Sequence, residues 1–409
     1  MTVEVESRGP SSTQLSALAS TINAAVSLYS STNDPYERDT ALRNIELASK
    51  QLSQCSVEPR RYLMGFHFQP HQVLSVRLAI EMGIFDNLPT SSPFTVNDLV
   101  KSNGTDPEFT GRVIRALAAV GIFEELHEGT FKQTQVSREW ANKNMQSYTK
   151  HAWDNIFVCM SKYMEFFKER GFVSPSDPMN SPYAFAKGVK DIDFFNILSQ
   201  DPKSVKIFNE AMTSIKDPLG SMYDFGTIQA RDDDVALVDI GGGKGQSIQS
   251  IRSTYPKLKG KFVLQDLPDV ILAGDRVCPP DVIAQSYDFL KQVQPVKAPA
   301  YSRYPGAATY LLKSILHDWP DAECRTILRN LAPAMRGYHS KLLIVELVLS
   351  DSNPDTSKVL YDINMLFCAG KERSVKQWHA LLEGTGFRIQ RIFGIDNPVR
   401  SVMEVVLDE

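Results

Sequence analysis

A histidine stands between a predicted strand and a predicted helix in the segment LLKSILHDWPDAEC, residues 311–324. The apolar run that ends at His317 predicts a buried strand. Pro320 followed by Asp321 and Glu323 is typical of a first helical turn. A neutral imidazole at such a strand end can take a proton from a hydroxyl group as its oxygen attacks. By itself this histidine fits a capping or core residue better, so a catalytic role requires partners.

A glycine-rich loop follows another predicted strand in VALVDIGGGKG, residues 235–245. Gly241, Gly243 and Gly245 would let the backbone approach a ligand closely. The dinucleotide pattern G-x-G-x-x-G would need a glycine where Gln246 stands, and the pattern G-x-x-x-x-G-K-[ST] is absent. The loop G-x-G-x-G after V-D-I fits S-adenosyl-L-methionine instead. The predicted cofactor contacts of this loop are Gly241, Gly242 and Gly243.

Acidic residues come at the ends of three successive predicted strands in this region. Asp239 ends the first strand, and Asp266 ends the second in KFVLQDLP, with Leu267 beside it as a further predicted contact. Asp266 could accept hydrogen bonds from both ribose hydroxyls. Asp288 follows the third strand and could bind the adenine amino group, while Phe289 flanks the ring. One such acid is more often a turn or cap residue, but three after one glycine loop predict a cofactor site.

The elements that would position these residues belong to a C-terminal domain, residues 226–409. Strand-like runs alternate there with helical patterns, which predicts a doubly wound, Rossmann-like α/β domain. Residues 151–225 are predicted to form a helical segment rich in aromatic residues and methionine, which suits a flat apolar ligand. The other six histidines carry no motif and are interpreted as structural or surface residues: His67, His71, His127, His151, His339 and His379.

The N-terminal part predicts association between two copies of the chain. Residues 1–56 combine a tail, residues 1–12, with two amphipathic helices that need a partner surface, so we expect a dimerisation extension. Residues 57–150 have three helical patterns and a hairpin, the outline of a winged helix. Between Val57 and Gln135 there are seven Lys or Arg residues against nine Asp or Glu residues, so no basic face is available for DNA. A packing and dimerisation module is favoured, and a regulatory DNA-binding protein is disfavoured.

The bulk composition of the 409 residues narrows the class of protein. A net charge of −4, with 43% hydrophobic and 22% charged residues, gives no reason to expect a nucleic acid or a membrane as a partner. Five scattered cysteines without a C-x-x-C pattern predict reduced thiols. No signal peptide or membrane helix is predicted, so we expect a cytoplasmic protein. No H-E-x-x-H or Cys/His cluster indicates a metal.

From about residue 60 onward the sequence resembles the plant and fungal class of S-adenosylmethionine-dependent O-methyltransferases, the caffeate-type family. The motifs LVDIGGGKG, QDLPDVI, YDF, LLKSILHDWPDAEC, LLIVELVL and DINMLFCAGKERSVKQWHALLEGTGF carry the resemblance, in the family's order. The resemblance implies a homodimer and methyl transfer to a hydroxyl of an aromatic small molecule, expected to be a specialised metabolite. The segment at residues 295–315 is longer than usual, which predicts a surface loop, and residues 1–56 match loosely.

The resemblance also implies roles for individual residues. His317 would be the general base, with Glu346 and Glu372 orienting its ring. The other implied positions are Lys313 at the amino-acid end of the cofactor, Phe208 and Met212 at the border of cofactor and acceptor, and Asp318 near the acceptor oxygen.

A wall of methionine and aromatic side chains predicts a bulky, flat acceptor. It leaves open a polyketide, an indole alkaloid or a phenylpropanoid, and a phenol, enol or N-hydroxyl as the methylated group. An enzyme of the same fold that runs a pericyclic or dehydration step is the alternative. Such an enzyme would be expected to have lost the base, yet His317 and both glutamates are present. The wall comprises Met160, Tyr163, Met164, Phe167, Phe208, Met212 and Met365.

Overall fold

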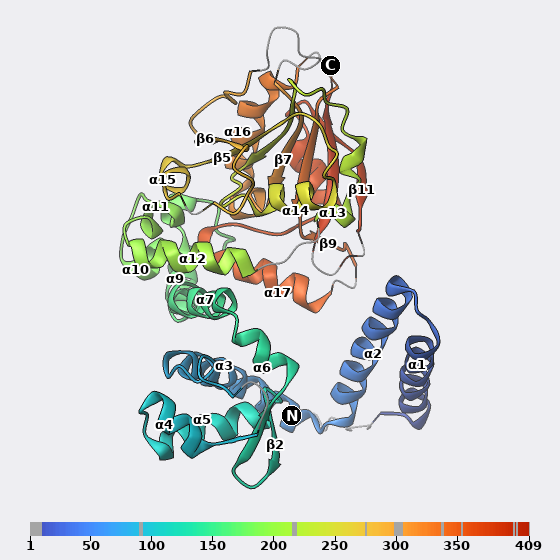
Figure 1. Cartoon of the computed structure of the whole chain (residues 1–409), viewed down its shortest axis with the longest axis vertical. Coiled ribbons are helices and arrows are strands. Elements are labelled where there is room, and N and C mark those ends of the chain that lie inside the picture. Colours follow the sequence, from blue (N-terminus) through green and yellow to red (C-terminus); the bar gives the residue numbers. More distant parts are fainter. Residues whose placement is uncertain are drawn as a thin grey trace. The chain divides into compact units, whose positions relative to one another are not determined.

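The computed structural model divides into two compact units, residues 1–137 and 138–409 (Figure 1). The predicted domain boundaries at residues 56, 150 and 225 stay predictions. Residues 1–9 of the predicted tail and residues 298–305 of the predicted surface loop lie outside the described residues. The structure describes residues 10–89, 93–214, 219–274, 276–297, 306–336, 339–352, 355–395, 397 and 400–408.

The first unit is mostly helical and contains a small antiparallel sheet. The two predicted N-terminal helices pack against each other as a hairpin. Three further helices accompany a sheet with the strand order β1-β3-β2, in which β1 lies between α3 and α4 in the chain and β2 and β3 follow α5. Helix α3 begins at Pro59, because the Glu58 side chain caps Arg60 N–H and Arg61 N–H, and the helix runs on through Pro70. The elements are α1 Ser12–Ser31, α2 Pro35–Ser56, α3 Pro59–Glu81, β1 Phe94–Thr95, α4 Val96–Asn103, α5 Pro107–Ala119, β2 Phe123–His127 and β3 Thr130–Gln133.

A series of short helices connects this sheet to the large sheet of the second unit. The longest of them, α7 and α12, pack against each other, and a π-helix, η1, directly continues α7. The elements are α6 Gln135–Trp140, α7 Lys143–His151, η1 Ala152–Phe157, α8 Val158–Met160, α9 Tyr163–Arg170, η2 Pro178–Asn180, α10 Pro182–Lys187, α11 Phe194–Leu198, α12 Pro202–Ser214, α13 Leu219–Met222 and η3 Phe225–Thr227.

The second unit is built on a seven-stranded sheet in the order β11-β12-β8-β7-β4-β5-β6. β6, β5, β4, β7 and β8 are parallel, whereas β12 runs antiparallel to both of its neighbours. The predicted Rossmann-like α/β domain is confirmed. β4 and β7 lie at the switch point, so the loops after them meet at one edge. The strands are β4 Val235–Ile240, β5 Lys261–Asp266, β6 Ile283–Ser286, β7 Ala307–Lys313, β8 Lys341–Glu346, β11 Phe387–Phe393 and β12 Ser401–Leu407.

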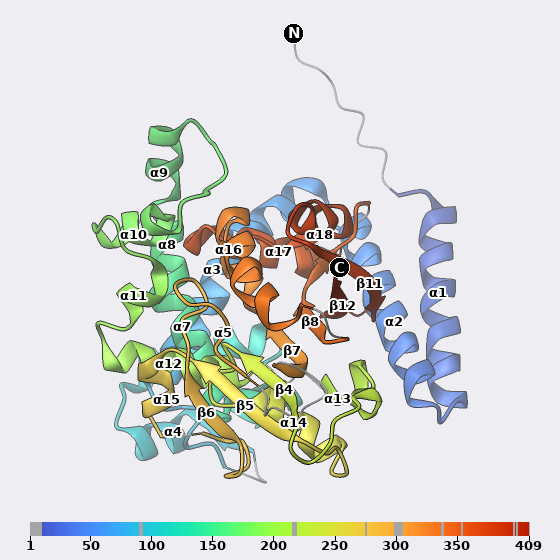
Figure 2. The ribbon, with the colours of Figure 1, turned by 90° about the horizontal axis from the view of Figure 1, so that it is seen from above.

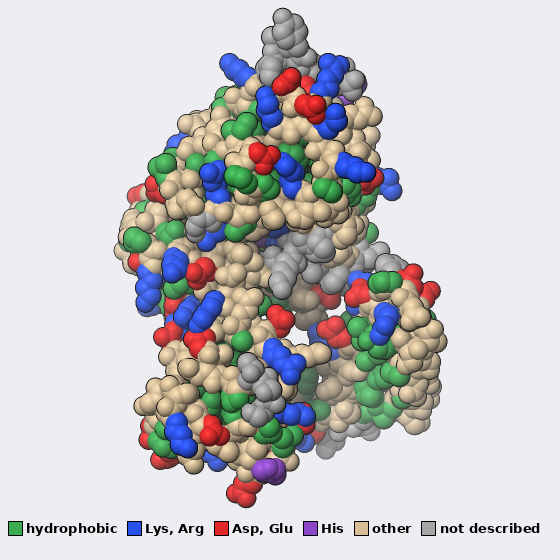
Figure 3. Space-filling model, viewed as in Figure 1, with side chains coloured by type: hydrophobic (Ala, Val, Ile, Leu, Met, Phe, Trp, Pro, Cys, Tyr) green, Lys and Arg blue, Asp and Glu red, His purple; other side chains and the backbone are tan. Residues whose placement is uncertain are grey.

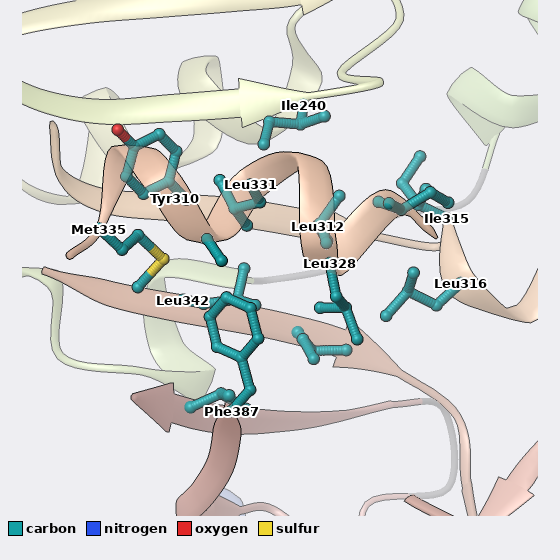
Figure 4. Packing of buried hydrophobic residues seen from close by; sticks show 14 of the residues in the cluster. Ile240, Tyr310, Leu312, Ile315, Leu316, Leu328, Leu331, Met335, Leu342 and Phe387 are labelled. Carbon is teal, nitrogen blue, oxygen red and sulfur yellow. The ribbon is translucent and has the colours of Figure 1, made fainter. Parts of the chain in front are cut away.

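Helices cover both faces of this sheet (Figure 2). Because side chains alternate along a strand, a strand buried on both faces is apolar throughout. Tyr310 and Leu312 of β7 pack on the face of α16 and α18 (Figure 4), whereas Leu311 packs on the face of α13 and α14. The helices and short elements of this part are α14 Gln246–Thr254, α15 Pro268–Leu272, η4 Leu316–Asp318, α16 Asp321–Leu331, η5 Ala332–Ala334, β9 Val348–Leu349, α17 Thr356–Met365, η6 Leu366–Cys368, β10 Arg373–Ser374 and α18 Val375–Leu382.

The surface carries charged side chains of both signs, in line with the small net charge of the sequence. Lys and Arg side chains are interspersed with Asp and Glu side chains on the face seen in Figure 3. Among the described residues, no helix combines the length and the apolar character that crossing a membrane requires.

Candidate active site

The turn that carries His317 is held by a carboxylate from the neighbouring strand. Glu346 ends β8 and is fully buried. Its Oε1 accepts hydrogen bonds from the backbone N–H groups of Ile315 (3.0 Å), Leu316 (2.9 Å) and His317 (3.4 Å). Its Oε2 lies 3.8 Å from Nδ1 of His317 and accepts no hydrogen bond from the described residues. Glu346 therefore holds the backbone of the turn through Oε1, while its Oε2 faces the imidazole ring of His317.

Glu372 makes the direct contact with the imidazole. Nδ1 of His317 and Oε1 of Glu372 are 2.8 Å apart. A carboxylate can only accept, so Nδ1 carries the proton and, in the neutral ring, Nε2 keeps its lone pair. Asp318 lies on that side, with Oδ1 3.6 Å from Nε2. The ring is thus oriented with its basic nitrogen away from Glu372.

The acidic surroundings control the charge of this cluster. Burial lowers the pKa of His317, but Glu346, Asp318 and Glu372 together outweigh burial and raise that pKa to about 10. Burial also raises the pKa of Glu346, and it raises the pKa of Asp318 to about 7, against the opposing effect of His317. Three acids around one imidazole leave an excess of negative charge, which favours a cation nearby.

Two residues of the segment GKER that sequence reasoning passed over hold the same turn. A Cβ atom on Gly370 would lie 2.2 Å from the backbone oxygen of His317, so only glycine fits there. The fully buried Arg373 donates hydrogen bonds to the carbonyls of Leu316 and Trp319, each at 2.9 Å. Their position beside Glu372 in one motif was the signal that could have identified them.

The glycine loop after β4 has the close backbone approach that its pattern predicts. Gly241 and Gly243 adopt φ values of +67° and +58°, a region that disfavours other residues. A Cβ atom on Gly242 would lie 2.5 Å from the Asp239 carboxylate. The N–H of Gly243 donates to Oδ2 of Asp266 at 2.8 Å. The loop is therefore a narrow backbone cradle beside an acid.

The acids near this loop can accept further hydrogen bonds. Asp266 already accepts from Gly243 N–H and, through Oδ1, from Leu267 N–H at 2.7 Å, but each carboxylate oxygen has a second lone pair. Asp239 was counted among the three strand-end acids, but no contact with the cofactor was assigned to it. It is buried, its Oδ2 accepts no hydrogen bond from the described residues, and burial raises its pKa to about 7 while Lys313 opposes the rise. A buried acceptor without a donor suits a polar ligand, so these residues fit the predicted cofactor.

The remaining predicted cofactor residues lie at neighbouring strand ends. Phe289 lies beside the loop, with its ring 3.6 Å from the Cβ position of Gly241. Lys313 is the last residue of β7. Asp288 accepts from Leu290 N–H at 3.1 Å and pairs with Lys291 at 3.0 Å, so it also has the local turn contacts of a cap residue.

The structure brings some of the predicted acceptor residues together. Phe208 and Met365 join one aromatic cluster with Tyr183, Phe194, Phe367 and Cys368. Met212 lies half-buried on α12, next to Thr213, whose hydroxyl accepts a hydrogen bond from Gln246 after the glycine loop. Met160 lies apart, with 52% of its surface exposed.

Comparison with known proteins places the chain in a family. The O-methyltransferase domain matches residues 175–388, and the O-methyltransferase dimerisation domain matches residues 66–143. The O-methyltransferase agiB of Aspergillus flavus is 33% identical over 303 residues, which cover 72% of this chain and 99% of that protein. The chain belongs to the family of S-adenosylmethionine-dependent O-methyltransferases, as its motifs predicted.

Solved structures share the fold of this chain over almost its whole length. LepI in complex with S-adenosylmethionine matches with a TM-score of 0.83 and 25% identity, covering 96% of this chain and 99% of that one. A protein described as a pericyclic reaction enzyme matches with a TM-score of 0.82 and 26% identity, over 96% and 100% of the two chains. The cofactor of the family is S-adenosylmethionine.

Proposed function

We propose that this protein transfers a methyl group to a hydroxyl oxygen of an aromatic small molecule, with His317 as the general base. The observation that supports this most directly is the 2.8 Å contact between Glu372 and Nδ1 of His317, which leaves Nε2 to accept a proton. General base catalysis of this kind contributes about 10²–10⁴-fold in rate. Glu372 would also stabilise the imidazolium that forms.

The cofactor would be held by the strand-end residues around β4. Its sulfonium supplies an already activated methyl group. Gly241, Gly242 and Gly243 would contact it with their backbone, and the acids with Phe289 would bind its ribose and adenine. The residues proposed for this part are Asp266, Leu267, Asp288, Phe289 and Lys313. Phe208, Met212, Met365 and Asp318 would border the acceptor, and Met160 would do so only if its side chain turned inward.

The protonation state of His317 determines whether it can act as a base. With a pKa of about 10, His317 keeps its proton at neutral pH in the free protein. An imidazolium loses its proton more readily when another cation lies beside it. We therefore expect His317 to become a competent base in the cofactor complex, while activity still rises with pH.

We also propose that the active form is a homodimer. Apart from the half-buried Tyr62, α3 is exposed from Pro59 to Gln72, and this stretch includes Leu63, Phe66 and Phe68, each at least half exposed in the single chain. Large exposed apolar side chains on a dimerisation domain indicate an interface. Light scattering should give twice the mass of one chain, and Leu63→Asp with Phe66→Asp should give a monomer. A monomeric wild-type protein would contradict this.

The alternative is a non-methylating reaction on the same fold, favoured by the structural match to a pericyclic reaction enzyme. A pericyclic step removes no proton and requires no base at position 317. The His317 cluster, with its ring oriented by Glu372, therefore supports methyl transfer over a pericyclic step.

The test is transfer of a labelled methyl group from S-adenosylmethionine to a panel of hydroxylated aromatic compounds. Wild type should label an oxygen, and His317→Ala should lower the rate by about 10² or more while binding S-adenosylhomocysteine normally. Equal rates for both proteins would remove the base role. Cofactor binding without any labelled product would favour the non-methylating alternative.

A further inference from the structure

A second histidine lies buried in the aromatic cluster, away from the glutamates. His151 ends α7 and is 5% exposed. Its ring packs edge to face against Phe208 at 5.2 Å and Phe194 at 6.3 Å between ring centroids. From the sequence it was interpreted as a structural or surface residue. Its contact with Phe208, a proposed border of the acceptor site, gives it a different setting.

A chain of hydrogen bonds fixes the proton of this ring. The hydroxyl of Tyr183 donates to Oδ1 of Asn155 at 2.8 Å, which turns the amide nitrogen of Asn155 toward Nδ1 of His151 at 2.9 Å. An amide nitrogen can only donate, so Nδ1 accepts and the neutral ring carries its proton on Nε2. Burial lowers the pKa of His151 to about 4, which keeps the ring neutral.

The N–H at Nε2 has no acceptor among the described residues. Nε2 lies on the side of the ring opposite the Asn155 contact. Nε2–H is thus a hydrogen-bond donor on a ring that packs against aromatic side chains. Although the residue is only 5% exposed, Nε2 does not belong to the enclosed polar atoms that lack a partner. It therefore keeps some accessible surface through which an oxygen atom of a ligand could approach. The π-helix that follows directly, Ala152–Phe157, is a rare element often found at functional sites.

Aromatic contacts continue from the surroundings of His151 toward the segments that carry Glu372 and His317. Phe194 stacks edge to face with Phe367 at 4.8 Å, five residues before Glu372. Phe195 packs on Trp319 at 5.8 Å, two residues after His317. Aromatic contacts therefore link the surroundings of His151 to the segments that carry His317 and Glu372.

We propose that His151 is an acceptor-binding residue whose Nε2–H donates a hydrogen bond to a second oxygen of the aromatic acceptor, one that is not methylated. This rests on the proposed function, since the first oxygen belongs to His317. With its Nδ1 occupied and its Nε2 protonated, His151 selects and orients the acceptor and removes no proton. The acceptor class is an aromatic compound with two oxygens.

The test measures binding without turnover. The full-length protein is saturated with S-adenosylhomocysteine and titrated calorimetrically with 2,3-dihydroxynaphthalene or 2-naphthol. Wild type should prefer the diol by about fivefold to tenfold, the range expected for one neutral hydrogen bond. His151→Phe should bind both compounds equally, and His151→Gln, which keeps a donor near the position of Nε2, should restore part of the preference.

The control is His379→Phe, a histidine exposed on α18, which should keep the full preference. Affinity for S-adenosylhomocysteine should be unchanged in all variants, which verifies folding. The same preference in wild type and His151→Phe would overturn the proposal, as would a wild type that binds neither naphthol at millimolar concentration. A preference that depends on His151 without methyl transfer would overturn the proposed function alone.

Discussion

The two turns at the switch point of the sheet are built by opposite means. The turn after β4 is shaped by its own glycines, since Gly241 and Gly243 adopt left-handed φ values and Gly242 has no room for a Cβ atom. Its Gly243 N–H donates to the Asp266 side chain at the end of the next strand. The turn after β7 contains no glycine and is held by side chains from distant segments, Glu346 and Arg373. The turn proposed to bind the cofactor is thus specified largely by its own sequence, whereas the turn that carries the proposed base depends on residues far along the chain.

The largest expected effect comes from removing the guanidinium that holds the second turn. Arg373→Met removes the charged donors of the buried carbonyls of Leu316 and Trp319, at about 1–3 kcal/mol each. These carbonyls then keep only the weak thiol donor of Cys324 and, for Leu316, the long contact to Trp319 N–H. The second unit should lose about 3 kcal/mol or more of its unfolding free energy. All four tryptophans lie within residues 138–409, so their fluorescence during urea denaturation reports that unit.

The matched control for this change is Arg325→Met. The half-exposed Arg325 also donates to two backbone carbonyls, those of Ala380 and Glu383, so its removal should cost about 1 kcal/mol. Equal losses of unfolding free energy in the two variants would mean that a buried arginine at position 373 adds no more stability than a half-exposed one at position 325.

Gly370→Ala should lower the rate of methyl transfer without weakening cofactor binding, because it disturbs only the turn after β7. The new Cβ would push against the backbone of His317 and displace the base. Displacing a reacting group by about 1 Å costs about 10²-fold in rate, whereas affinity for S-adenosylhomocysteine should stay as in wild type. Gly111→Ala on α5, where the added Cβ would make only an ordinary contact with Val96 at 3.9 Å, serves as control. A variant that loses cofactor binding together with turnover would contradict the separation of the two turns.

Glu372→Gln should change the pH dependence of the reaction. Glu372 raises the pKa of His317, and the base acts when deprotonated, so kcat/KM should rise with pH in wild type. Removing the charge lowers that pKa, and the rising limb should move to lower pH by about one unit or more. The maximum should fall about tenfold from lost orientation. Rates from pH 6 to 10.5 test this, with the exposed Glu383→Gln as control, and an unmoved limb would refute it.

The smallest expected effect is that of a chelator. His317, Glu346 and Glu372 have ligand atoms within 4.8 Å of one another, a spacing that could hold a metal ion. Oε1 of Glu346 is already engaged by backbone N–H groups, so we expect methyl transfer to be unchanged by EDTA. Loss of activity with EDTA and its recovery with a divalent cation would reverse the assignment of this cluster.

The same contrast explains what the sequence could predict. Glycine spacing and strand-end acids are local patterns, so the cradle at Gly241–Gly243 and Asp266 could be identified directly. The partners of His317 come from 29 and 55 residues further along the chain, and only the family resemblance identified them. Gly370 and His151 were missed because a close backbone approach and an unpaired N–H exist only in three dimensions. Pro70 lies inside α3, although proline usually marks a helix boundary.

The hydrogen bonds from the β7 turn to Glu346 make strand alignment a determinant of catalysis. Lys313 pairs with Val345, the residue before Glu346. A slip of one residue between β7 and β8 would move the carboxylate by about 3.3 Å and send it to the opposite face of the sheet. Such a misaligned domain could keep most of its apolar core and still have no positioned base. The fraction of active molecules after refolding would therefore measure the fraction in which β7 and β8 pair in the correct register.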